Sequence, residues 1–499
     1  MAAYFAAIFV IFADMNLKSL AKDTAIYGLS SIVGRFLNYL LVPVYTYHIA
    51  AESGGYGIVS NLYAYSAFLL ALLTFGMETT LFRFANKDGE NPEMVYSNAL
   101  RMVGTVGLVF LAAVFCFLGP ISGAMGYAAH PEYIGCVAII AALDAFQAIM
   151  FVRLRQQHRP MKFMALKMLF IFMSIFMTLF VFLVMPKMFA SHPALEQAFI
   201  KYDYGVGFIF FINLFCTFVV TFGFIKELRG IGYGFDKALA GRMLRYTWPI
   251  LLFSVVGILN QVADKMLLPK LMPGKDGMVQ LGIYGACVKI AMIMALLTQA
   301  FRYAYEPIVF GGKDKSDKKT TLADGMKYYI IFTLLAYLAV VFYLPLVKHF
   351  IAPGYWEGLG VVPVVMLAEL FMGVYSNLSF WYKLTDQTWW GALISAIAVA
   401  AMIAINVIFV PRIGYWACAW GGLAGYSIAM VLSYFIGQKK YPIDYDLRTI
   451  FTFVLIAAVY YYLYTTVDGL GKSMWISMGF GTLLLLSYLY FVYKTIKQK

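Results

Sequence analysis

Long apolar stretches alternate with short polar connections along almost the whole chain. About 20 consecutive apolar residues are enough for a helix to cross the hydrocarbon core of a bilayer. The pattern therefore predicts fourteen membrane-spanning helices, at residues 24–48, 57–82, 95–118, 134–152, 164–185, 204–225, 246–269, 280–301, 327–350, 359–382, 389–410, 414–437, 449–466 and 473–493. The connections are too short to hold a soluble catalytic domain.

Composition agrees with this pattern. Of the 499 residues 62% are apolar and 13% charged, and the mean hydropathy is +0.78. A soluble fold is excluded at these values, so we expect an all-α polytopic membrane protein. The five cysteines are scattered without metal-ligand spacing, and no strand precedes a glycine-rich phosphate loop. The sequence therefore predicts no cofactor, apart from a coupling H⁺ or Na⁺, and no enzyme.

The basic residues are distributed unevenly between the two sides of the predicted membrane. Of the 38 lysines and arginines, 28 fall in or beside connections on one side of the predicted helices and seven on the other. Because positive charge is retained on the cytoplasmic side, the larger group is predicted to be cytoplasmic, together with both chain termini. The net charge of +13 is then a topology signal, and no nucleic-acid partner is expected.

Three cations remain inside predicted helices: Arg35, Lys265 and Lys289. An unpaired cation facing lipid costs several kcal/mol, about 3 or more, so each of them needs a partner. One interpretation is that they bind a pyrophosphate anion, with Asn38 and Gln261 on the same helix faces as Arg35 and Lys265. The alternative is a structural pair with an acid, and for Lys265 also a side chain that extends outward to the membrane surface.

Acidic residues also lie within the predicted helices. Asp144 and Glu369 occupy equivalent depths in the 134–152 and 359–382 helices, and Asp264 precedes Lys265. A buried carboxyl can carry a proton or ligate sodium, which predicts ion coupling. The alternative is a charge pair with Arg35 or Lys289.

Two further charge pairs lie at predicted cytoplasmic helix ends. Glu78 and Arg83 lie in or next to the end of the 57–82 helix, and Arg302 and Glu306 follow the 280–301 helix. We interpret the four as an inner gate that joins the two lobes when the cavity opens outward. The alternative for Arg302 and Glu306 is a solvated i,i+4 helical pair.

Short sequence matches suggest an internal repeat. Ser31-Ile-Val-Gly34 matches Ser254-Val-Val-Gly257, and each is followed by Tyr-Gly and then Ala-Leu-Leu-Thr. The repeat predicts two six-helix lobes related by a pseudo-two-fold axis along the membrane normal, plus two C-terminal helices. The predicted division is a possible misassigned extension (1–14), an N-lobe (15–226), a cytoplasmic linker (227–245), a C-lobe (246–437) and a C-terminal helix pair with tail (438–499).

Four segments resemble one transporter superfamily. They are Asn406-Val-Ile-Phe-Val-Pro-Arg-Ile-Gly414-Tyr-Trp-Ala-Cys-Ala-Trp420, Phe380-Trp-Tyr-Lys-Leu-Thr-Asp386, Gln299-Ala-Phe-Arg-Tyr-Ala-Tyr-Glu-Pro307 and Ala25-Ile-Tyr-Gly-Leu-Ser-Ser31. The chain resembles the polysaccharide and O-antigen branch of the multidrug/oligosaccharidyl-lipid/polysaccharide (MOP) exporter superfamily.

The resemblance implies a flippase in the bacterial inner membrane that moves an undecaprenyl-pyrophosphate-linked oligosaccharide by alternating access. It also implies a cationic cavity lined by the first, second, seventh and eighth helices, a lipid-tail groove at the last two, and polysaccharide polymerase machinery as a partner. Two alternatives stay open: a multidrug/cation antiporter of the same fold, and a membrane glycan polymerase or ligase.

Overall fold

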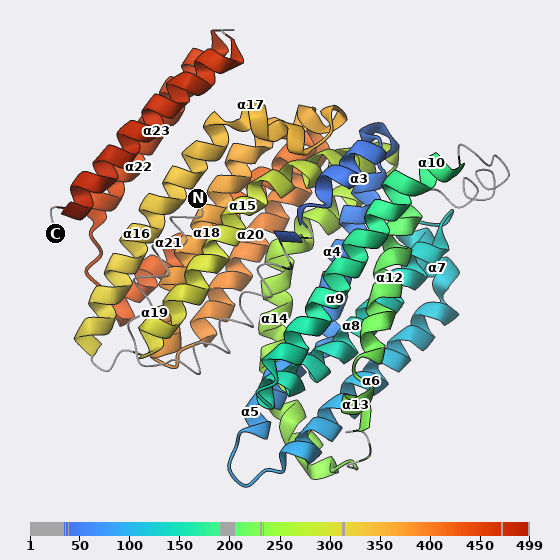
Figure 1. Cartoon of the computed structure of the whole chain (residues 1–499). Helices are drawn as coiled ribbons and strands as arrows, with labels where there is room; N and C mark the ends of the chain where they lie inside the picture. Colours follow the sequence, from blue (N-terminus) through green and yellow to red (C-terminus); the bar gives the residue numbers. More distant parts are fainter. Residues whose placement is uncertain are drawn as a thin grey trace.

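All regular structure in the described part of the chain is helical (Figure 1). The computed structural model describes residues 34, 36–37, 39–189, 205–229, 232, 234–311, 315–470 and 473–497. Twelve of the described helices are long and apolar enough to cross a membrane, and Val206–Phe222 is a shorter apolar helix. The predicted extension 1–14 and nearly half of the predicted 24–48 helix lie outside the described residues, so the total of fourteen stays a prediction.

The N-terminal bundle occupies one side of the molecule in Figure 1. Its elements are α3 (Val42–His48), η1 (Ala51–Ser53), α4 (Gly55–Thr74), α5 (Met77–Ala85), α6 (Pro92–Cys116), α7 (Leu118–Ala124), α8 (Pro131–Gln156), α9 (Pro160–Leu179), a π-helical turn (Phe180–Val184), α10 (Met185–Phe189), α12 (Val206–Phe222) and α13 (Ile225–Leu228). The helices α6, α8 and α9 each begin at a proline, whose missing N–H costs nothing in the first turn.

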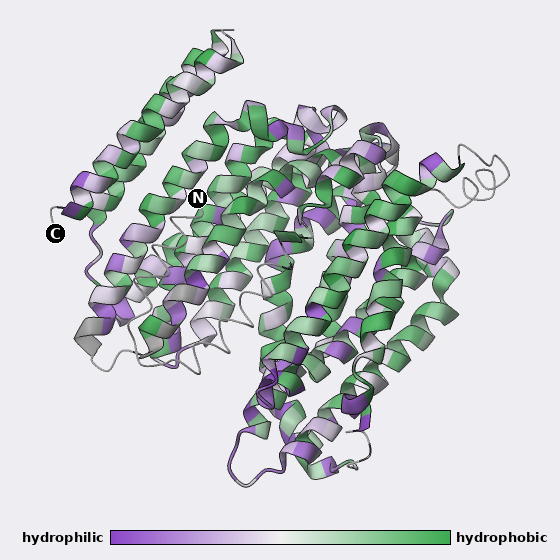
Figure 2. Cartoon of the chain, in the orientation of Figure 1, coloured by the Kyte–Doolittle hydropathy of each residue, from purple (hydrophilic) through white to green (hydrophobic). Residues whose placement is uncertain are grey.

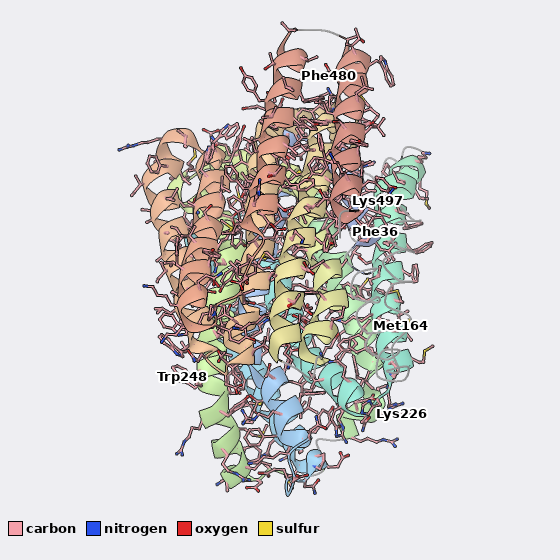
Figure 3. The ribbon with its side chains drawn as sticks, turned by 90° about the vertical axis from the view of Figure 1, so that its left-hand side faces the viewer. Phe36, Met164, Lys226, Trp248, Phe480 and Lys497 are labelled. Carbon is pink, nitrogen blue, oxygen red and sulfur yellow. The ribbon has the colours of Figure 1, made fainter. Side chains whose placement is uncertain are left out.

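The C-terminal bundle lies beside it. Its elements are α14 (Lys237–Leu271), α15 (Lys275–Gly311), α16 (Lys315–Phe342), α17 (Leu344–Val347), η4 (Lys348–Phe350), η5 (Pro353–Gly360), α18 (Val361–Leu378), α19 (Phe380–Leu384), α20 (Trp389–Ile413) and α21 (Tyr415–Lys440). A last pair, α22 (Leu447–Gly469) and α23 (Met474–Lys497), packs on the outer side of α16 (Figures 1 and 3).

The two ends of the molecule differ in polarity. We name them the α3 end, which carries α3, η1 and η5, and the α5 end, which carries α5 and α13. Hydrophilic residues gather at the α5 end of the N-terminal bundle (Figure 2). In Figure 3, Lys226 lies toward this end and Phe480 near the opposite end. The α5 end is therefore the one that the charge pattern predicts to be cytoplasmic.

Large apolar side chains also cover the outside of the bundles. On α9, Phe172 and Phe176 are 59% and 70% exposed, and on α12 Phe215 and Phe218 are about half exposed. Exposed aromatic rows of this kind would be a liability in water. They suit a surface in contact with lipid, where helices satisfy all their backbone hydrogen bonds internally.

Two helices begin nine or more residues earlier than hydropathy predicts. The helix α14 starts at Lys237, where the predicted span starts at 246, because the Asp236 side chain caps it by accepting from the N–H groups of Ala238 and Leu239. The helix α16 starts at Lys315, where the predicted span starts at 327. Both helices continue as polar turns beyond the apolar segment, and an apolar-length criterion does not detect such turns.

Candidate functional site

The two bundles meet along α4 and α15, where glycines allow the backbones to approach. A Cβ added to Gly57 on α4 would overlap the carbonyl oxygen of Met278 on α15. A Cβ on Gly285 would lie 2.6 Å from the Ser60 hydroxyl. Gly57 and Gly285 are the glycines of the two repeated Tyr-Gly pairs, so the repeat lies at the bundle interface.

Hydrogen bonds between side-chain hydroxyls and backbone groups join the bundles at the α3 end. The Tyr355 hydroxyl donates to the carbonyl of Ile49 at 2.7 Å, and the N–H of Ala352 donates to the Thr46 hydroxyl at 3.3 Å. The Tyr47 hydroxyl donates to the carbonyl of His349 at 3.1 Å. The ribbons of the bundles meet near this end and diverge toward the α5 end (Figure 1).

The helix α14 belongs to both bundles. Near its start, the Thr247 hydroxyl is hydrogen bonded to that of Thr80 on α5. Three turns further on, Asn260 donates to the carbonyl of Ser395 on α20 at 3.4 Å, and its own carbonyl accepts from Tyr426 on α21 at 3.2 Å. This helix therefore crosses from the N-terminal bundle at the α5 end to the C-terminal bundle at the α3 end.

Lys265 and Lys289 lie beside this interface. The carbonyl of Lys265 accepts from Asn61 of α4 at 2.7 Å, and Lys289 lies one turn beyond Gly285, on the α4-facing side of α15. The two ammonium groups are near enough for their charges to repel. Lys265 is bonded to the carbonyl of Gln261 at 2.9 Å and to Asp264 at 3.3 Å. No described acid forms an ion pair with Lys289.

An acidic cluster lies next to these cations. The Asp264 carboxylate is buried and accepts from the Tyr284 hydroxyl at 2.8 Å. Glu369 on α18 interacts electrostatically with Lys265 and Asp264. One carboxyl oxygen of Glu369 is buried without a hydrogen-bond partner among the described residues. A buried carboxyl oxygen that lacks a partner can accept a proton or a cation.

The N-terminal bundle holds a second charged cluster. Asp144 on α8 accepts from the Thr217 hydroxyl at 3.5 Å, and the charge that acts most strongly on it is that of Lys167 on α9. The Lys167 ammonium also lies 4.2 Å from the ring centre of Phe151. The sequence had suggested Arg35 or Lys289 as the cation for this acid.

A cavity of about 500 Å³ opens at the α5 end, between the broken helix pair α4–α5 and the helices α8 and α14. Its walls are formed by Thr74, Gly76, Glu78, Thr79, Phe82, Arg83, Arg155 and Ser254. The Arg83 guanidinium lies 4.3 Å above the ring centre of Tyr246. We call this space the α5 cavity.

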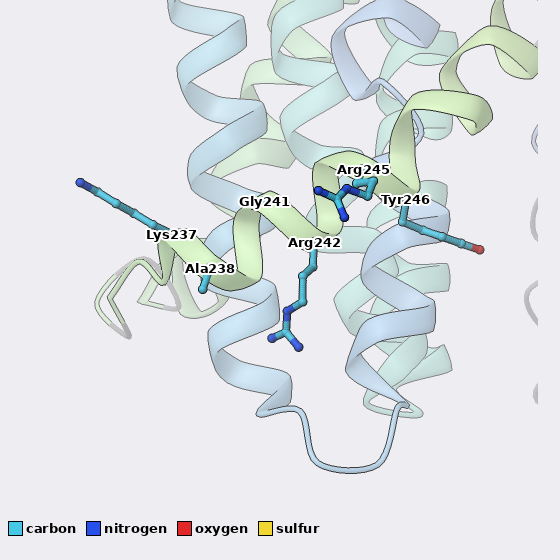
Figure 4. Close-up of a pocket in the computed structure, with 6 residues that line it drawn as sticks. All are labelled: Lys237, Ala238, Gly241, Arg242, Arg245 and Tyr246. Carbon is cyan, nitrogen blue, oxygen red and sulfur yellow. The ribbon is translucent and has the colours of Figure 1, made fainter.

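Tyr246 also borders a second, more open cavity of about 560 Å³ on the first turns of α14 (Figure 4). Its lining is basic, with Lys237, Arg242 and Arg245. Arg242 is paired with Glu90 at 2.8 Å. Figure 4 shows Lys237 pointing away from the helix and Arg245 lying close to it. The α5 end of this bundle therefore offers several cations within a few helical turns.

A family model described as polysaccharide biosynthesis protein matches residues 20–304, more than half of the chain. The chain belongs to the polysaccharide biosynthesis protein family. No curated protein matches it. The family, together with a fold shared with solved transporters, bears out the prediction of a membrane transporter rather than an enzyme.

Solved structures with this family member's fold include transporters of two kinds. A lipid II flippase MurJ in an inward closed conformation matches with a TM-score of 0.69 at 14% identity, covering 95% of this chain and 99% of that one. An inward-facing multidrug resistance MATE family transporter of the MOP superfamily matches at 0.64, with 13% identity, 81% of this chain and 94% of that one. The MATE multidrug transporter DinF-BH matches at 0.58, with 15% identity, 88% and 98%. The MOP fold predicted from the sequence is therefore confirmed.

In this member of the polysaccharide biosynthesis protein family, the predicted site residues fall into four groups. Arg35 and Asn38 lie outside the described residues. The structure brings Lys265 and Lys289 together with Asp264, Gln261 and Glu369 around α14, α15 and α18. Asp144 lies in the other bundle. The predicted gate residues are not joined across the bundles, since Arg302 pairs with Glu306 of its own helix at 3.2 Å.

Two cations were missed as site candidates because sorting by side assigned them to the cytoplasmic connections. Lys167 acts on Asp144, and Arg155 lines the α5 cavity. For Lys167 the sequence held a signal, since it lies inside its own predicted span, 164–185. Arg155 follows the predicted 134–152 span, and no pattern in the sequence singles it out.

Proposed function

We propose that the chain flips a lipid-linked oligosaccharide, carried on undecaprenyl pyrophosphate, across the bacterial inner membrane. The observation that carries the proposal is the pair Lys265 and Lys289 at the bundle interface. Two cations that repel each other, one of them without an ion pair to a described acid, are stabilised when an anion enters between them. A pyrophosphate supplies that charge. Arg35 and Asn38, from the predicted 24–48 helix, are proposed to complete its site.

The fold alone does not distinguish substrates, because flippase and multidrug structures share it. The charge of the interface supports an anionic substrate over the alternative, a cationic drug. Cation-binding pockets need acidic or aromatic walls, and here Asp264 is already bonded to Lys265 and Tyr284. The family model, which is described by polysaccharide biosynthesis, also supports a glycan lipid.

Transport is proposed to proceed by rocking of the two lobes, residues 15–226 and 246–437, with the lobes in an inward-facing arrangement here. The α3 end, which is proposed to be the outer end, is joined by the Tyr355–Ile49 hydrogen bond and by the Gly57–Met278 approach. The inward-facing MATE structure gives a TM-score of 0.64 and an outward-facing one 0.54. Both facts support the proposal that the substrate enters from the α5 end.

A coupling ion is proposed for the carboxyls. Glu369 has a buried oxygen without a described partner, and Asp264 lies between Lys265 and Tyr284. If substrate displaced Lys265 from Asp264, the freed carboxylate would bind H⁺ or Na⁺ more strongly. Asp144, beside Lys167, is the corresponding group of the N-lobe. Binding of substrate and of ion would then be coupled through one lysine.

The test is complementation of a strain that lacks this gene. The deletion should strand lipid-linked repeat units on the inner leaflet, whereas loss of a polymerase would leave flipped but unjoined units. The wild-type gene should restore export, and Lys265→Gln/Lys289→Gln should lower it at least tenfold, as should Arg35→Gln/Lys289→Gln. Lys270→Gln, an exposed residue on the same α14, is the control. Normal export by both double variants would refute the pyrophosphate proposal.

A further inference from the structure

The α5 cavity has the composition of a phosphate site. Its volume, about 500 Å³, lies within the range of small-ligand pockets, about 300–1,000 Å³. Arg83 and Arg155 line it, and neither forms an ion pair with a described acid. Guanidinium groups bind phosphate oxygens through two parallel hydrogen bonds, which makes unpaired arginines in a cavity well suited to that anion.

The position of Arg83 is constrained before any ligand arrives. Its guanidinium stacks over the Tyr246 ring, and the adjacent Thr247 is hydrogen bonded to Thr80 of the same α5. The short helix α5 and the start of α14 therefore hold the arginine from two sides. A side chain that is already ordered loses less entropy when it binds.

The break between α4 and α5 adds backbone donors. Phe75 and Gly76 adopt the left-handed conformation, with φ of 36° and 75°, which ends α4 and starts α5. No side chain caps the start of α5, and Gly76, Glu78 and Thr79 line the cavity. The free N–H groups and the dipole of a half-helix N-terminus favour an anion.

The single acid of the cavity does not cancel this preference. Glu78 interacts electrostatically with Lys167, which lies on α9 and is not among the residues of the cavity wall. Against two arginines, one carboxylate leaves the cavity with a net positive charge. Like-charge repulsion from Glu78 is thus outweighed for a ligand that carries two or more negative charges.

A polar face of α14 runs from the α5 cavity to the central lysines. Ser254, in the cavity wall, and Lys265 are eleven residues apart, which is about 16 Å along the axis and three turns, so they share one face. Between them, Gln261 is exposed and Gly257 has open space around it. Apart from Ile258, which lies on the same face, a charged headgroup would meet polar or small residues along this path.

We propose that the α5 cavity is a second anion site, in which Arg83 and Arg155 hold the diphosphate of the incoming lipid before it reaches Lys265 and Lys289. This inference rests on the proposed function and adds an entry step to it. The ligand chemistry is a phosphate or diphosphate group. Because the cavity is walled by membrane-spanning helices, the source is a lipid headgroup.

The test measures binding to the full-length protein purified in detergent, by calorimetry, with two probes: inorganic pyrophosphate and farnesyl diphosphate. We expect Arg83→Gln/Arg155→Gln to weaken binding of both probes to this site by about tenfold per guanidinium, the loss of one charge-assisted contact each. Arg83→Lys/Arg155→Lys should weaken binding less, because lysine keeps the positive charge but lacks the paired N–H donors of a guanidinium. Farnesyl diphosphate should bind at least as tightly as pyrophosphate.

The control is Lys440→Gln/Arg448→Gln, which removes two exposed cations at the same predicted side but far along the chain. An equal loss of affinity in this control would mean that the overall field binds the probes, and would overturn the proposal. Binding of inorganic pyrophosphate without farnesyl diphosphate would overturn the lipid source.

The two proposals fail separately. If probe binding is lost in Lys265→Gln/Lys289→Gln and unchanged in Arg83→Gln/Arg155→Gln, the central site exists and the entry site does not. If Arg83→Gln/Arg155→Gln loses one binding event while export survives neutralisation of the central lysines, the entry site stands and the central site fails. Circular dichroism and size-exclusion profiles that match the wild type show that each variant is folded.

Discussion

The helix pair α4–α5 and the helix α15 carry the two copies of the predicted repeat, and they end differently. Both contain Ala-Leu-Leu-Thr, at residues 71–74 and 295–298. After the first copy, Phe75-Gly76 takes left-handed backbone angles and the helix stops. After the second, Gln299-Ala300 continues α15 to Gly311. The repeat is thus kept where the bundles meet and lost at the α5 end.

The difference changes what each arginine can do. Arg83 lies on the separate short helix α5, stacks on Tyr246 and faces the α5 cavity. Arg302 lies on the continuous helix, where Glu306 is one turn away and binds it. A break in one copy therefore leaves its arginine unpaired beside a cavity, whereas an intact helix supplies a partner from its own next turn.

The largest expected effect lies where the copies are alike. In Gly57→Ala the new Cβ would overlap the Met278 carbonyl, and a helical backbone cannot shift without moving α15. We expect the α3 end to be forced apart and flipping to be abolished. Double electron–electron resonance between labels at Glu52→Cys and Asp276→Cys should report a longer distance.

Gly422→Ala on α21, where an added Cβ has no neighbour within 4 Å, is the matched substitution. The Gly422→Ala protein should flip the lipid-linked substrate at the wild-type rate. Unchanged distance and normal flipping in Gly57→Ala would mean that the α3 end does not need the close approach of α4 and α15.

A smaller effect is expected where the copies differ. Gly76→Ala places a Cβ at a φ of 75° and 2.8 Å from an Ile250 methyl, which should destabilise the protein by about 1–2 kcal/mol. The reciprocal Ala300→Gly adds backbone freedom to an intact helix and should cost about 1 kcal/mol. Thermal unfolding in detergent measures both, and Gly76→Ala should also lose pyrophosphate affinity while Ala300→Gly keeps it.

Equal pyrophosphate affinity in Gly76→Ala and Ala300→Gly would show that the helix break has no part in the α5 cavity. The stability changes would then reflect backbone preference alone. The structural difference between the two repeat copies would then have no consequence for anion binding.

Much of the fold follows from hydropathy and charge, because the bilayer imposes length and sidedness on each helix. The pairing of charges between helices does not. One alternative paired Asp144 with Arg35 or Lys289, whereas among the described charges that of Lys167 acts on it most strongly. Lys167 falls within its predicted span, yet sorting by side removed it from the candidates. The sequence shows depth along a helix, whereas the partner depends on which faces pack together.

The α5 cavity could not be predicted from the sequence, for a similar reason. Glycine in an apolar segment is common in membrane helices, so Gly76 carries no signal of a break until its backbone angle is known. Arg155 looked like one topology charge among many. By contrast, Lys265 and Lys289 stood out from sequence because a cation inside a predicted span needs an explanation.

The smallest expected effect concerns Arg302, where the gate interpretation and the helical-pair interpretation give different results. As a partly exposed i,i+4 pair, Arg302–Glu306 contributes at most about 0.5 kcal/mol to stability, so Arg302→Gln should leave thermal unfolding almost unchanged. If the α5 ends of the lobes close through Arg302 and Glu78 when the α3 end opens, the same variant should slow flipping a few-fold. We expect the slower rate, with Lys440→Gln at wild-type rate. An unchanged rate would reduce Arg302–Glu306 to a helical pair and leave the α5 end of α15 without a role in closure.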